Sequence, residues 1–355
     1  MTSGGVEAPS GVVHFVVPAG VDDPARTSGG NVFDRRAAEG LSAIGWDVRI
    51  VRVDAATDVA RALSHLSTGA LVLVDGLVAR RAPDAIEAAA ERLRVVVLAH
   101  MVSAAFPDAD PREVEGERRA LRVARRVIAT SEWTRTELMR SEEIPAERIV
   151  VATPGADDAP IAIGTPTGGA LLCVGVVAPH KGQDVLIEAL RRLDANAPWT
   201  CTIAGSLDAC PDFADRIGAL VADAGLGDRV AMTGVLSQSE LDEAYRRTDL
   251  VVAPARVESY GMAIADALRR GIPVIASAVG GIPQTVAGSG AALLVPPDDP
   301  KELSEALRRW MSDPRLRARL KGEAVRTRSS LPRWSDTVDR IGATLAALQT
   351  LARTP

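Results

Sequence analysis

Short apolar runs alternate with amphipathic stretches along most of this 355-residue chain. In the stretches between the runs, apolar residues recur at three- and four-residue spacing, as they do on one face of a helix. This alternation predicts parallel β-sheets covered by helices. It occurs as two series of expected strands: 12–17, 47–53, 70–75, 94–99, 127–130 and 148–152, then 171–175, 200–205, 229–232, 250–253, 273–276 and 292–295.

The two series predict two domains. A stretch rich in Pro, Gly and Thr separates them, which is typical of a linker. We expect an N-terminal Rossmann-like domain over residues 1–160, a linker over 161–169 and a C-terminal Rossmann-like domain over 170–332. Residues 333–355 repeat apolar positions at helical spacing. We expect them to form a terminal helix that packs back towards the N-terminal domain.

Composition excludes several classes of protein. The net charge is −5 and the pI is about 5.6, so no global field attracts nucleic acid. The three cysteines show neither metal-binding spacing nor a disulfide framework. The first apolar run ends at Pro18 and is too short for a signal core or a membrane span. We expect a cytoplasmic protein without a transmembrane segment and leave peripheral membrane contact open.

Two carboxylates, Glu258 and Asp266, flank a predicted strand-to-helix turn. At the helical rise they lie on the order of 10 Å apart, roughly the reach from a sugar to a ribose across a diphosphate. The helix N-terminus between them attracts phosphate. The alternative interpretation is that Glu258 caps the helix and Asp266 is a solvated acid.

Other candidate residues also follow predicted strands. Gly29 and Gly30 open a helix after the first strand, Asp75 and His100 end the third and fourth, and Lys181 precedes the first helix of the second domain. Parallel sheets bind ligands at the carboxyl ends of their strands. Two doubly wound domains that face each other across a cleft would therefore present all these residues to one ligand.

With these residues in place, the chain resembles the family 4 glycosyltransferases. The most specific stretches are 174–190 and 258–276, supported by 279–283, 129–134 and 334–336. The resemblance covers nearly the whole sequence and implies the GT-B fold. It also implies a retaining, metal-independent enzyme, a hexosyltransferase, that moves a sugar from a nucleoside-diphosphate sugar to an unidentified acceptor without any cofactor.

The resemblance also implies roles for individual residues. Lys181 corresponds to the lysine at the donor diphosphate, Glu258 to the glutamate at the transferred sugar, and His100 to the histidine that touches that sugar. Asp266 stands where a second glutamate binds the ribose. The other expected donor-binding positions are the glycine loop at Gly29 and Gly30, the base loop at Leu236 and Gln238, and the turn amides at Tyr260, Gly261 and Met262.

Two departures from the family pattern bear on donor binding. Val176 stands where the family has an arginine, so one of two expected diphosphate cations is missing there. Asp266 is one methylene shorter than the usual glutamate. Arg35, Arg36 or Arg256 is a candidate for the missing charge.

Other functions remain open at this stage. Asp108 and Asp110 match a D-x-D pattern, by which carboxylates of another glycosyltransferase architecture hold a divalent cation. A GT-B-like nucleotide-sugar epimerase would use the same donor site without an acceptor, and a noncatalytic nucleotide-sugar-binding protein would use it without reaction. Acceptor choice is expected in the N-terminal loops at 75–83 and 101–117.

Overall fold

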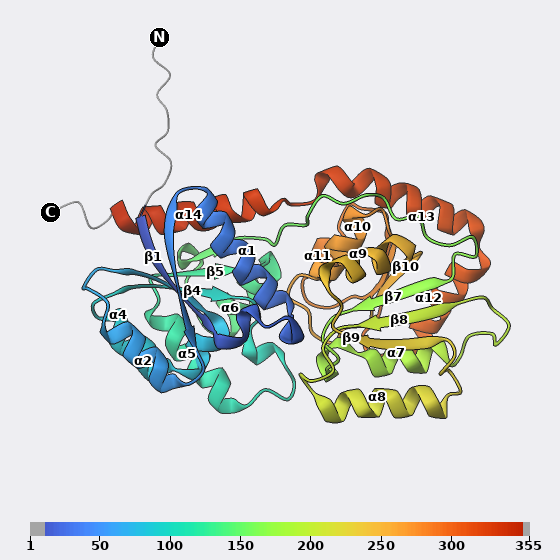
Figure 1. The fold of residues 1–355 in the computed structure, drawn as a ribbon, viewed down its shortest axis with the longest axis horizontal. Coiled ribbons are helices and arrows are strands. Elements are labelled where there is room, and N and C mark those ends of the chain that lie inside the picture. The colour runs from blue at the N-terminus through green and yellow to red at the C-terminus, as the bar shows by residue number, and fades with distance from the viewer. Residues whose placement is uncertain (1–10, 351–355) are drawn as a thin grey trace, which may run out of the picture. The chain divides into compact units, whose positions relative to one another are not determined.

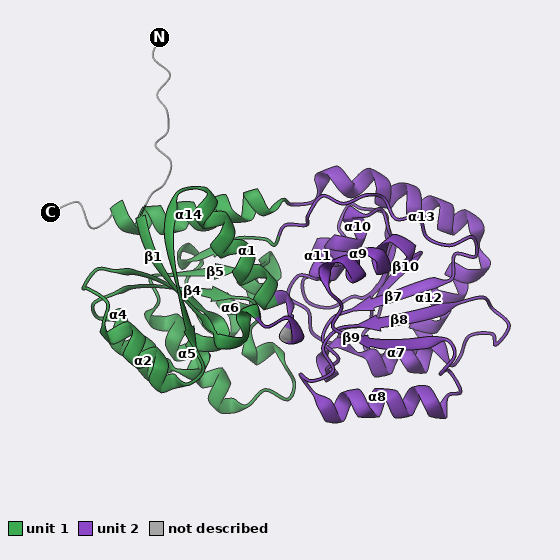
Figure 2. Ribbon diagram, viewed as in Figure 1, with its two compact units in different colours: residues 1–22, 30–154, 333–355 green, residues 23–29, 155–332 purple. Residues whose placement is uncertain are grey.

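The computed structural model describes residues 11–350, and these form two compact units (Figures 1 and 2). Unit 1 contains residues 11–22, 30–154 and 333–350; unit 2 contains residues 23–29 and 155–332. Each unit holds one six-stranded parallel sheet with helices on its faces. The predicted α/β class is confirmed, and every expected strand is present within one or two residues of its expected bounds.

The sheet of unit 1 has the order β2-β1-β3-β4-β5-β6. Chain order reverses between β1 and β3, which makes this position the topological switch point. The strands are β1 (Gly11–Pro18), β2 (Trp46–Val53), β3 (Leu71–Asp75), β4 (Arg94–Ala99), β5 (Arg126–Ala129) and β6 (Ile149–Val151). The helices are α1 (Gly29–Ala43), α2 (Ala56–Ser64), α3 (Gly76–Arg81), α4 (Pro83–Ala90), α5 (Pro111–Val123), α6 (Glu132–Ser141) and α14 (Trp334–Thr350).

The last helix completes the core of unit 1. One face of α14 is buried together with α1 and the inner positions of β1, β3 and β4; its core residues are Val338, Ile341, Leu345 and Leu348. Phe33 of α1 packs edge-on against Trp334, with ring centroids 5.6 Å apart. The C-terminal stretch therefore belongs to the same packed body as the first strand, although the whole of unit 2 separates them in sequence (Figure 2).

The sheet of unit 2 has the order β12-β11-β10-β7-β8-β9, with its switch point between β10 and β7. The strands are β7 (Ala170–Val174), β8 (Thr200–Ala204), β9 (Val230–Gly234), β10 (Leu250–Ala253), β11 (Val274–Ser277) and β12 (Ala292–Val295). The helices are α7 (Gln183–Leu190), α8 (Pro211–Asp223), α9 (Gln238–Arg247), α10 (Met262–Arg269), α11 (Ile282–Thr285), α12 (Pro300–Ser312) and α13 (Pro314–Thr327).

The stretch 161–169, which we expected as a linker, lies along unit 2. The amides of Ala162 and Ile163 donate to the carbonyls of Arg270 and Arg246, each at 2.8 Å. The buried carboxylate of Asp249 accepts from the amide of Thr165 at 3.0 Å. Because its backbone groups are bonded in this way, the segment is fixed to unit 2 despite its loop-like composition.

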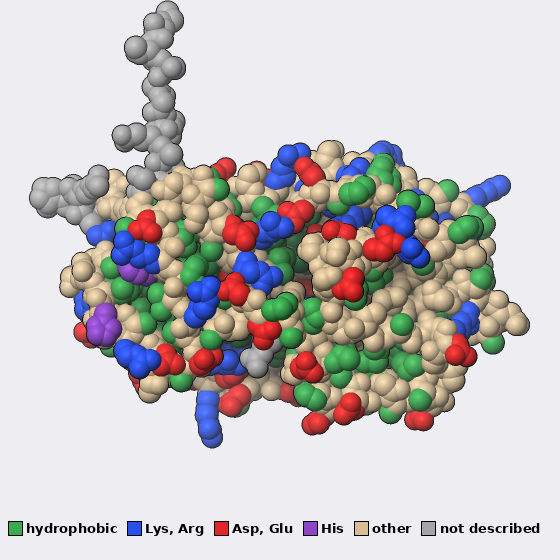
Figure 3. Space-filling view, in the orientation of Figure 1, with side chains coloured by type: hydrophobic (Ala, Val, Ile, Leu, Met, Phe, Trp, Pro, Cys, Tyr) green, Lys and Arg blue, Asp and Glu red, His purple; other side chains and the backbone are tan. Residues whose placement is uncertain are grey.

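The surface fits the small net charge. On the face drawn in Figure 3, Lys and Arg side chains are interspersed with Asp and Glu. None of the helices within residues 11–350 is both long and apolar enough to cross a membrane.

Candidate donor site and a buried histidine cluster

Lys181 and Glu258 meet at the switch point of unit 2. Lys181 ends a short 3₁₀ helix, η5 (Pro179–Lys181), in the loop after β7, and Glu258 lies in the loop after the neighbouring strand β10. The Lys181 Nζ atom is 2.6 Å from Glu258 Oε2, and the two side chains are 24% and 15% exposed. Two expected site residues from different loops therefore form a direct ion pair.

Backbone contacts hold the two loops together. The amides of Arg256 and Val257 donate to the His180 carbonyl at 2.8 and 3.2 Å, and the Gly281 amide donates to the Glu258 carbonyl at 2.9 Å. Gly182 has φ +68°, and a Cβ atom there would lie 2.0 Å from the Pro254 carbonyl oxygen. Only glycine fits this approach, so the sequence itself fixes the distance between the lysine loop and the glutamate loop.

The ion pair sets the charge states around it. Burial raises the pKa of Glu258, but attraction to Lys181 and the hydrogen bond from Lys181 outweigh it, and the net pKa lies below the ordinary value. Burial and the nearby Lys181 lower the pKa of His180 to about 4. At neutral pH Glu258 is therefore a carboxylate paired with Lys181, beside an uncharged imidazole.

Helix α10 begins next to this pair. Gly261, with φ +96°, is its N-cap, and Tyr260 before it is buried and held through its carbonyl by the Thr285 hydroxyl at 2.5 Å. The first amides of a helix have no partners within the helix. The start of α10 at Met262 thus provides amide donors and the positive end of a dipole near Glu258.

The remaining expected donor residues of unit 2 lie on neighbouring elements. Asp266 is on α10, 34% exposed, with Oδ1 at 3.9 Å from the Arg270 guanidinium. Leu236 and Gln238 flank Ser237, whose side chain caps α9 by accepting from the Glu240 amide. Gln238 is exposed, whereas Leu236 is partly buried against the core.

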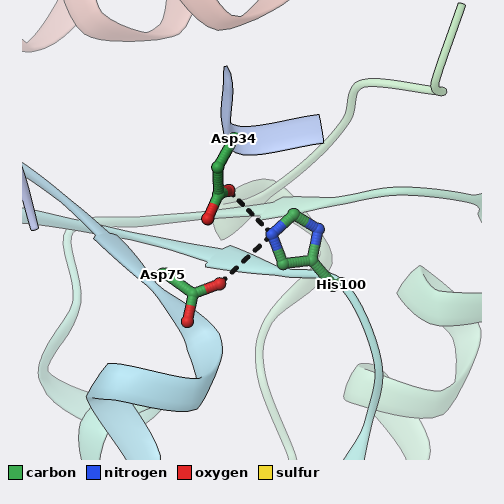
Figure 4. Close-up of side chains that lie close together, drawn as sticks. All are labelled: Asp34, Asp75 and His100. Atoms are coloured by element: carbon green, nitrogen blue, oxygen red, sulfur yellow. Dashed lines mark hydrogen bonds and ion pairs between the residues drawn. The ribbon is translucent and has the colours of Figure 1, made fainter. Parts of the chain in front are cut away.

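In unit 1, His100 directly follows β4 and contacts two buried aspartates (Figure 4). Its Nε2 atom is 2.9 Å from Asp34 Oδ1 and 3.2 Å from Asp75 Oδ2. Asp34 lies on α1 and Asp75 ends β3, so this cluster sits at the switch point of unit 1. Both carboxylates approach the same ring nitrogen (Figure 4).

The cluster contains two carboxyl groups around one imidazole. Burial opposes the imidazolium, but attraction to Asp34 and hydrogen bonds to Asp34 and Asp75 raise the pKa of His100 to about 10. Burial raises the pKa of Asp34 to about 6, against the opposing attraction of His100. Ligand atoms of all three side chains lie within 4.8 Å, close enough to share a cation. A cation bound there would have to displace the ring proton, since a metal-bound nitrogen must be unprotonated.

The glycine pair at the start of α1 precedes this cluster in the chain. Gly29 is the first residue of α1, followed by Gly30. Asp34, one turn further on, is only 2% exposed and faces His100. Its carboxylate is therefore directed at the histidine and not at the surface of the helix.

Two other sets of candidates have structural partners. Asp110 caps α5 by accepting from the Arg112 amide at 2.8 Å. This capping role explains one of the two aspartates of the D-x-D pattern.

The Arg256 guanidinium is bound by Asp184 at 2.9 and 3.0 Å and by Asp298 at 2.5 Å. Arg35 donates to the Val21 carbonyl at 2.5 Å. Arg256 therefore already serves other carboxylates and is a poor replacement for the arginine missing at Val176.

Part of the chain is similar in sequence to known glycosyltransferases. Residues 165–327 match the family described as glycosyl transferases group 1. This stretch lies within unit 2, and the chain spans about 60% of the length of the curated relatives that it matches. The chain is 30% identical to a D-inositol 3-phosphate glycosyltransferase of Kineococcus radiotolerans over 259 residues, which is 64% of this chain and 60% of that protein. It is also 30% identical to an alpha-D-kanosaminyltransferase of Streptomyces kanamyceticus, over 61% of this chain and 58% of that protein.

Solved structures confirm the GT-B fold expected from the sequence. A sucrose-phosphate synthase from Thermosynechococcus elongatus superposes with a TM-score of 0.82 at 21% identity, covering 96% of this chain and 99% of that one. The Anabaena protein HepE, solved with UDP and glucose, gives a TM-score of 0.76 at 18% identity over 94% and 99% of the two chains.

Proposed function

We propose that the protein is a retaining, metal-independent glycosyltransferase that takes its sugar from a nucleoside-diphosphate sugar bound by unit 2. The observation that carries the proposal is the Lys181–Glu258 ion pair, formed at the switch point of the unit that matches the family. A cation for the diphosphate and a carboxylate for the sugar are thus adjacent before any ligand binds.

Donor binding would use one fixed cation and backbone amides. Lys181 supplies the positive charge, and the first amides of α10 supply donors for phosphate or sugar oxygens. Asp266 would accept from the ribose hydroxyls, and the loop at Leu236 and Gln238 would receive the base. No second cation stands at Val176, so the amides carry more of the diphosphate charge than in relatives with an arginine there.

The reaction breaks the bond between the anomeric carbon and the β-phosphate oxygen and joins the acceptor oxygen to that carbon. In the front-face route, the leaving phosphate takes the proton of the acceptor hydroxyl. Lys181 and the α10 amides stabilise the negative charge on the leaving diphosphate. Glu258, held ionised by Lys181, stabilises positive charge on the sugar ring and does not act as a nucleophile.

Unit 1 would provide His100 and the acceptor contacts. His100 is proposed to contact the transferred sugar, as the family resemblance implies, with Gly29 and Gly30 near the phosphates. The acceptor is a hydroxyl compound selected by the loops at 75–83 and 101–117.

A ligand screen tests the proposal. UDP, GDP, ADP and dTDP are compared by thermal shift with the full chain, because a ligand that binds the native state raises its transition temperature. At least one diphosphate should stabilise the chain more than its nucleoside does. The nucleotide-sugar with the same base is then incubated with sugar alcohols and glycosides, and the anomeric configuration of any product is read by NMR. Stabilisation by none of the four diphosphates, or a product of inverted configuration, contradicts the proposal.

A further inference from the structure

We propose that Asp34 and Asp75 are positioning residues that hold the His100 ring protonated and oriented, so that its Nδ1–H is a permanent donor to a hydroxyl oxygen of the bound sugar. The identity of the oxygen rests on the proposed function. The charge and orientation of the ring rest on the geometry of unit 1 alone.

The first argument is the one-sided arrangement of the acids. Both carboxylates meet the ring at Nε2, and Nδ1 lies on the side of the ring turned away from them (Figure 4). Within the described residues, no hydrogen bond engages Nδ1. The side chain is 14% exposed, so the free nitrogen is the part of the ring left for a ligand.

The second argument is charge. Asp34 and Asp75 are each 2% exposed, and a buried carboxylate without a cation is costly. Asp75 Oδ1 also accepts from the amides of Leu77 and Val78 at 2.8 and 3.1 Å, which fixes the carboxylate at the start of α3. A positively charged ring facing both acids compensates this burial, whereas a neutral ring would leave the negative charge unopposed.

The third argument is that nothing else competes for the ring. Phe33 packs against it edge-on at 5.2 Å, and the Thr130 hydroxyl donates to the His100 carbonyl at 3.1 Å. Both neighbours are uncharged. Among the described residues, Asp34 on α1 and Asp75 on β3 are the charged groups that face the imidazole, so these two set its protonation.

The consequence is a histidine that only donates. A neutral imidazole can accept at one nitrogen and donate at the other, but an imidazolium donates at both. With Nε2–H committed to the aspartates, Nδ1–H favours a ligand oxygen with a free lone pair, as in a sugar hydroxyl. It disfavours a ligand that presents an ammonium group at the same place.

The charge of the ring is tested by NMR of the full chain labelled with ¹³C,¹⁵N-histidine. The chain has four histidines, and His100→Asn assigns the His100 signal. From about pH 6 to about pH 9 the His100 signal should keep the cationic shift, and Asp34→Asn and Asp75→Asn should each move its midpoint down by about one unit or more. Glu142→Gln, which replaces another buried carboxyl of unit 1 outside the acceptor loops, is the matched control and should leave it unmoved.

Three results overturn the proposal. These are a wild-type His100 that titrates near the ordinary histidine value, a midpoint unmoved in both aspartate variants, and displacement of the ring proton by stoichiometric Zn²⁺ or Mn²⁺, which would make the cluster a metal site. The wild-type titration decides the matter even if a variant fails to fold.

Calorimetry then tests the sugar contact with UDP and UDP-glucose as probes. Both aspartate variants should bind UDP as the wild type does but UDP-glucose several-fold more weakly, and the loss should be absent in Glu142→Gln. Equal losses for UDP and UDP-glucose would refute the sugar contact. If the wild type binds neither probe, the proposed function fails for uridine donors, while the NMR titration still decides the charge of His100.

Discussion

The two units place a cation against carboxylate at equivalent points of their sheets, but they balance the charges differently. In unit 2 one lysine faces one glutamate, and both are partly accessible. In unit 1 one histidine faces two aspartates, both buried. The first pair is balanced, and in the proposed function Lys181 would exchange part of its contact for a diphosphate. The second cluster has two carboxyl groups for one imidazole. The additional carboxyl group keeps the histidine positively charged whatever binds nearby.

Removing the cation of unit 2 should have the largest effect on stability. Lys181→Met leaves the Glu258 carboxylate buried without a partner, and breaking such a pair costs about 3 kcal/mol. The double variant with Glu258→Gln should recover most of this loss. Denaturant unfolding of both variants measures it, with Lys301→Ala, an exposed lysine, as the control. Equal stability of the single and double variants would show that the pair is not coupled.

Removing the acid of unit 2 should act on turnover more than on binding. Glu258→Gln keeps the shape of the side chain but loses the charge that stabilises the developing positive sugar, so turnover should fall by about tenfold or more. UDP affinity should change much less. The readout is release of UDP from UDP-glucose, with water or a glycoside as acceptor. Normal turnover in this variant would reduce Glu258 to a partner of Lys181.

Removing the carboxylate of Asp266 should weaken nucleotide binding. Asp266→Ala removes a charged acceptor for ribose hydroxyls, worth about 1.5 to 3 kcal/mol, or roughly tenfold or more in affinity. Asp266→Glu should be tolerated. Calorimetry with UDP and uridine should show the same loss for both, since both contain ribose. Unchanged UDP affinity in Asp266→Ala would show that Asp266 contacts Arg270 and does not bind the nucleotide.

The two aspartates around His100 should make the stability of the protein depend on pH. The folded-state pKa of His100, about 10, lies above its ordinary value of 6.5. Its contribution is therefore fully present below pH 6.5 and is lost as pH rises through 10. The melting temperature of the wild type should exceed that of His100→Asn by several degrees at neutral pH and lose this advantage at about pH 10. A constant difference would mean that the ring is neutral throughout.

Chelation should have the smallest effect. Lys181 and the α10 amides supply the positive charge at the proposed diphosphate site, and Asp110 is engaged in capping α5. Transfer or donor hydrolysis should therefore be unchanged after EDTA treatment. Loss of activity that Mg²⁺ or Mn²⁺ restores would contradict metal independence and return Asp108 and Asp110 to consideration.

The sequence predicted the strands because a strand buried on both faces is a local run of apolar residues. The loops of Lys181 and Glu258 were also predictable, since glycines such as Gly182 and Gly261 are local signals of special backbone geometry. The pairing of the two residues was not, because it depends on the adjacency of β7 and β10, which are far apart in the chain.

The histidine cluster shows the same limit more sharply. Asp75 and His100 stood out as strand ends, but Asp34 had the position of an ordinary acid in the first turns of a helix. Its burial against His100 arises from the packing of α1 on the sheet, which periodicity does not specify. Arg256 illustrates the converse, since its partners Asp184 and Asp298 are 72 and 42 residues away and could not be foreseen from local sequence.

The most direct test of the central claim, that Lys181 and Glu258 form a diphosphate-sugar site, is calorimetry of UDP and uridine with the wild type and Lys181→Ala. The variant should lose about ten- to a hundredfold in UDP affinity, since a charge-assisted contact contributes about 1.5 to 3 kcal/mol, and should bind uridine as before. Lys301→Ala should bind both like the wild type. Equal UDP affinity in Lys181→Ala and a UDP-binding wild type would contradict the claim.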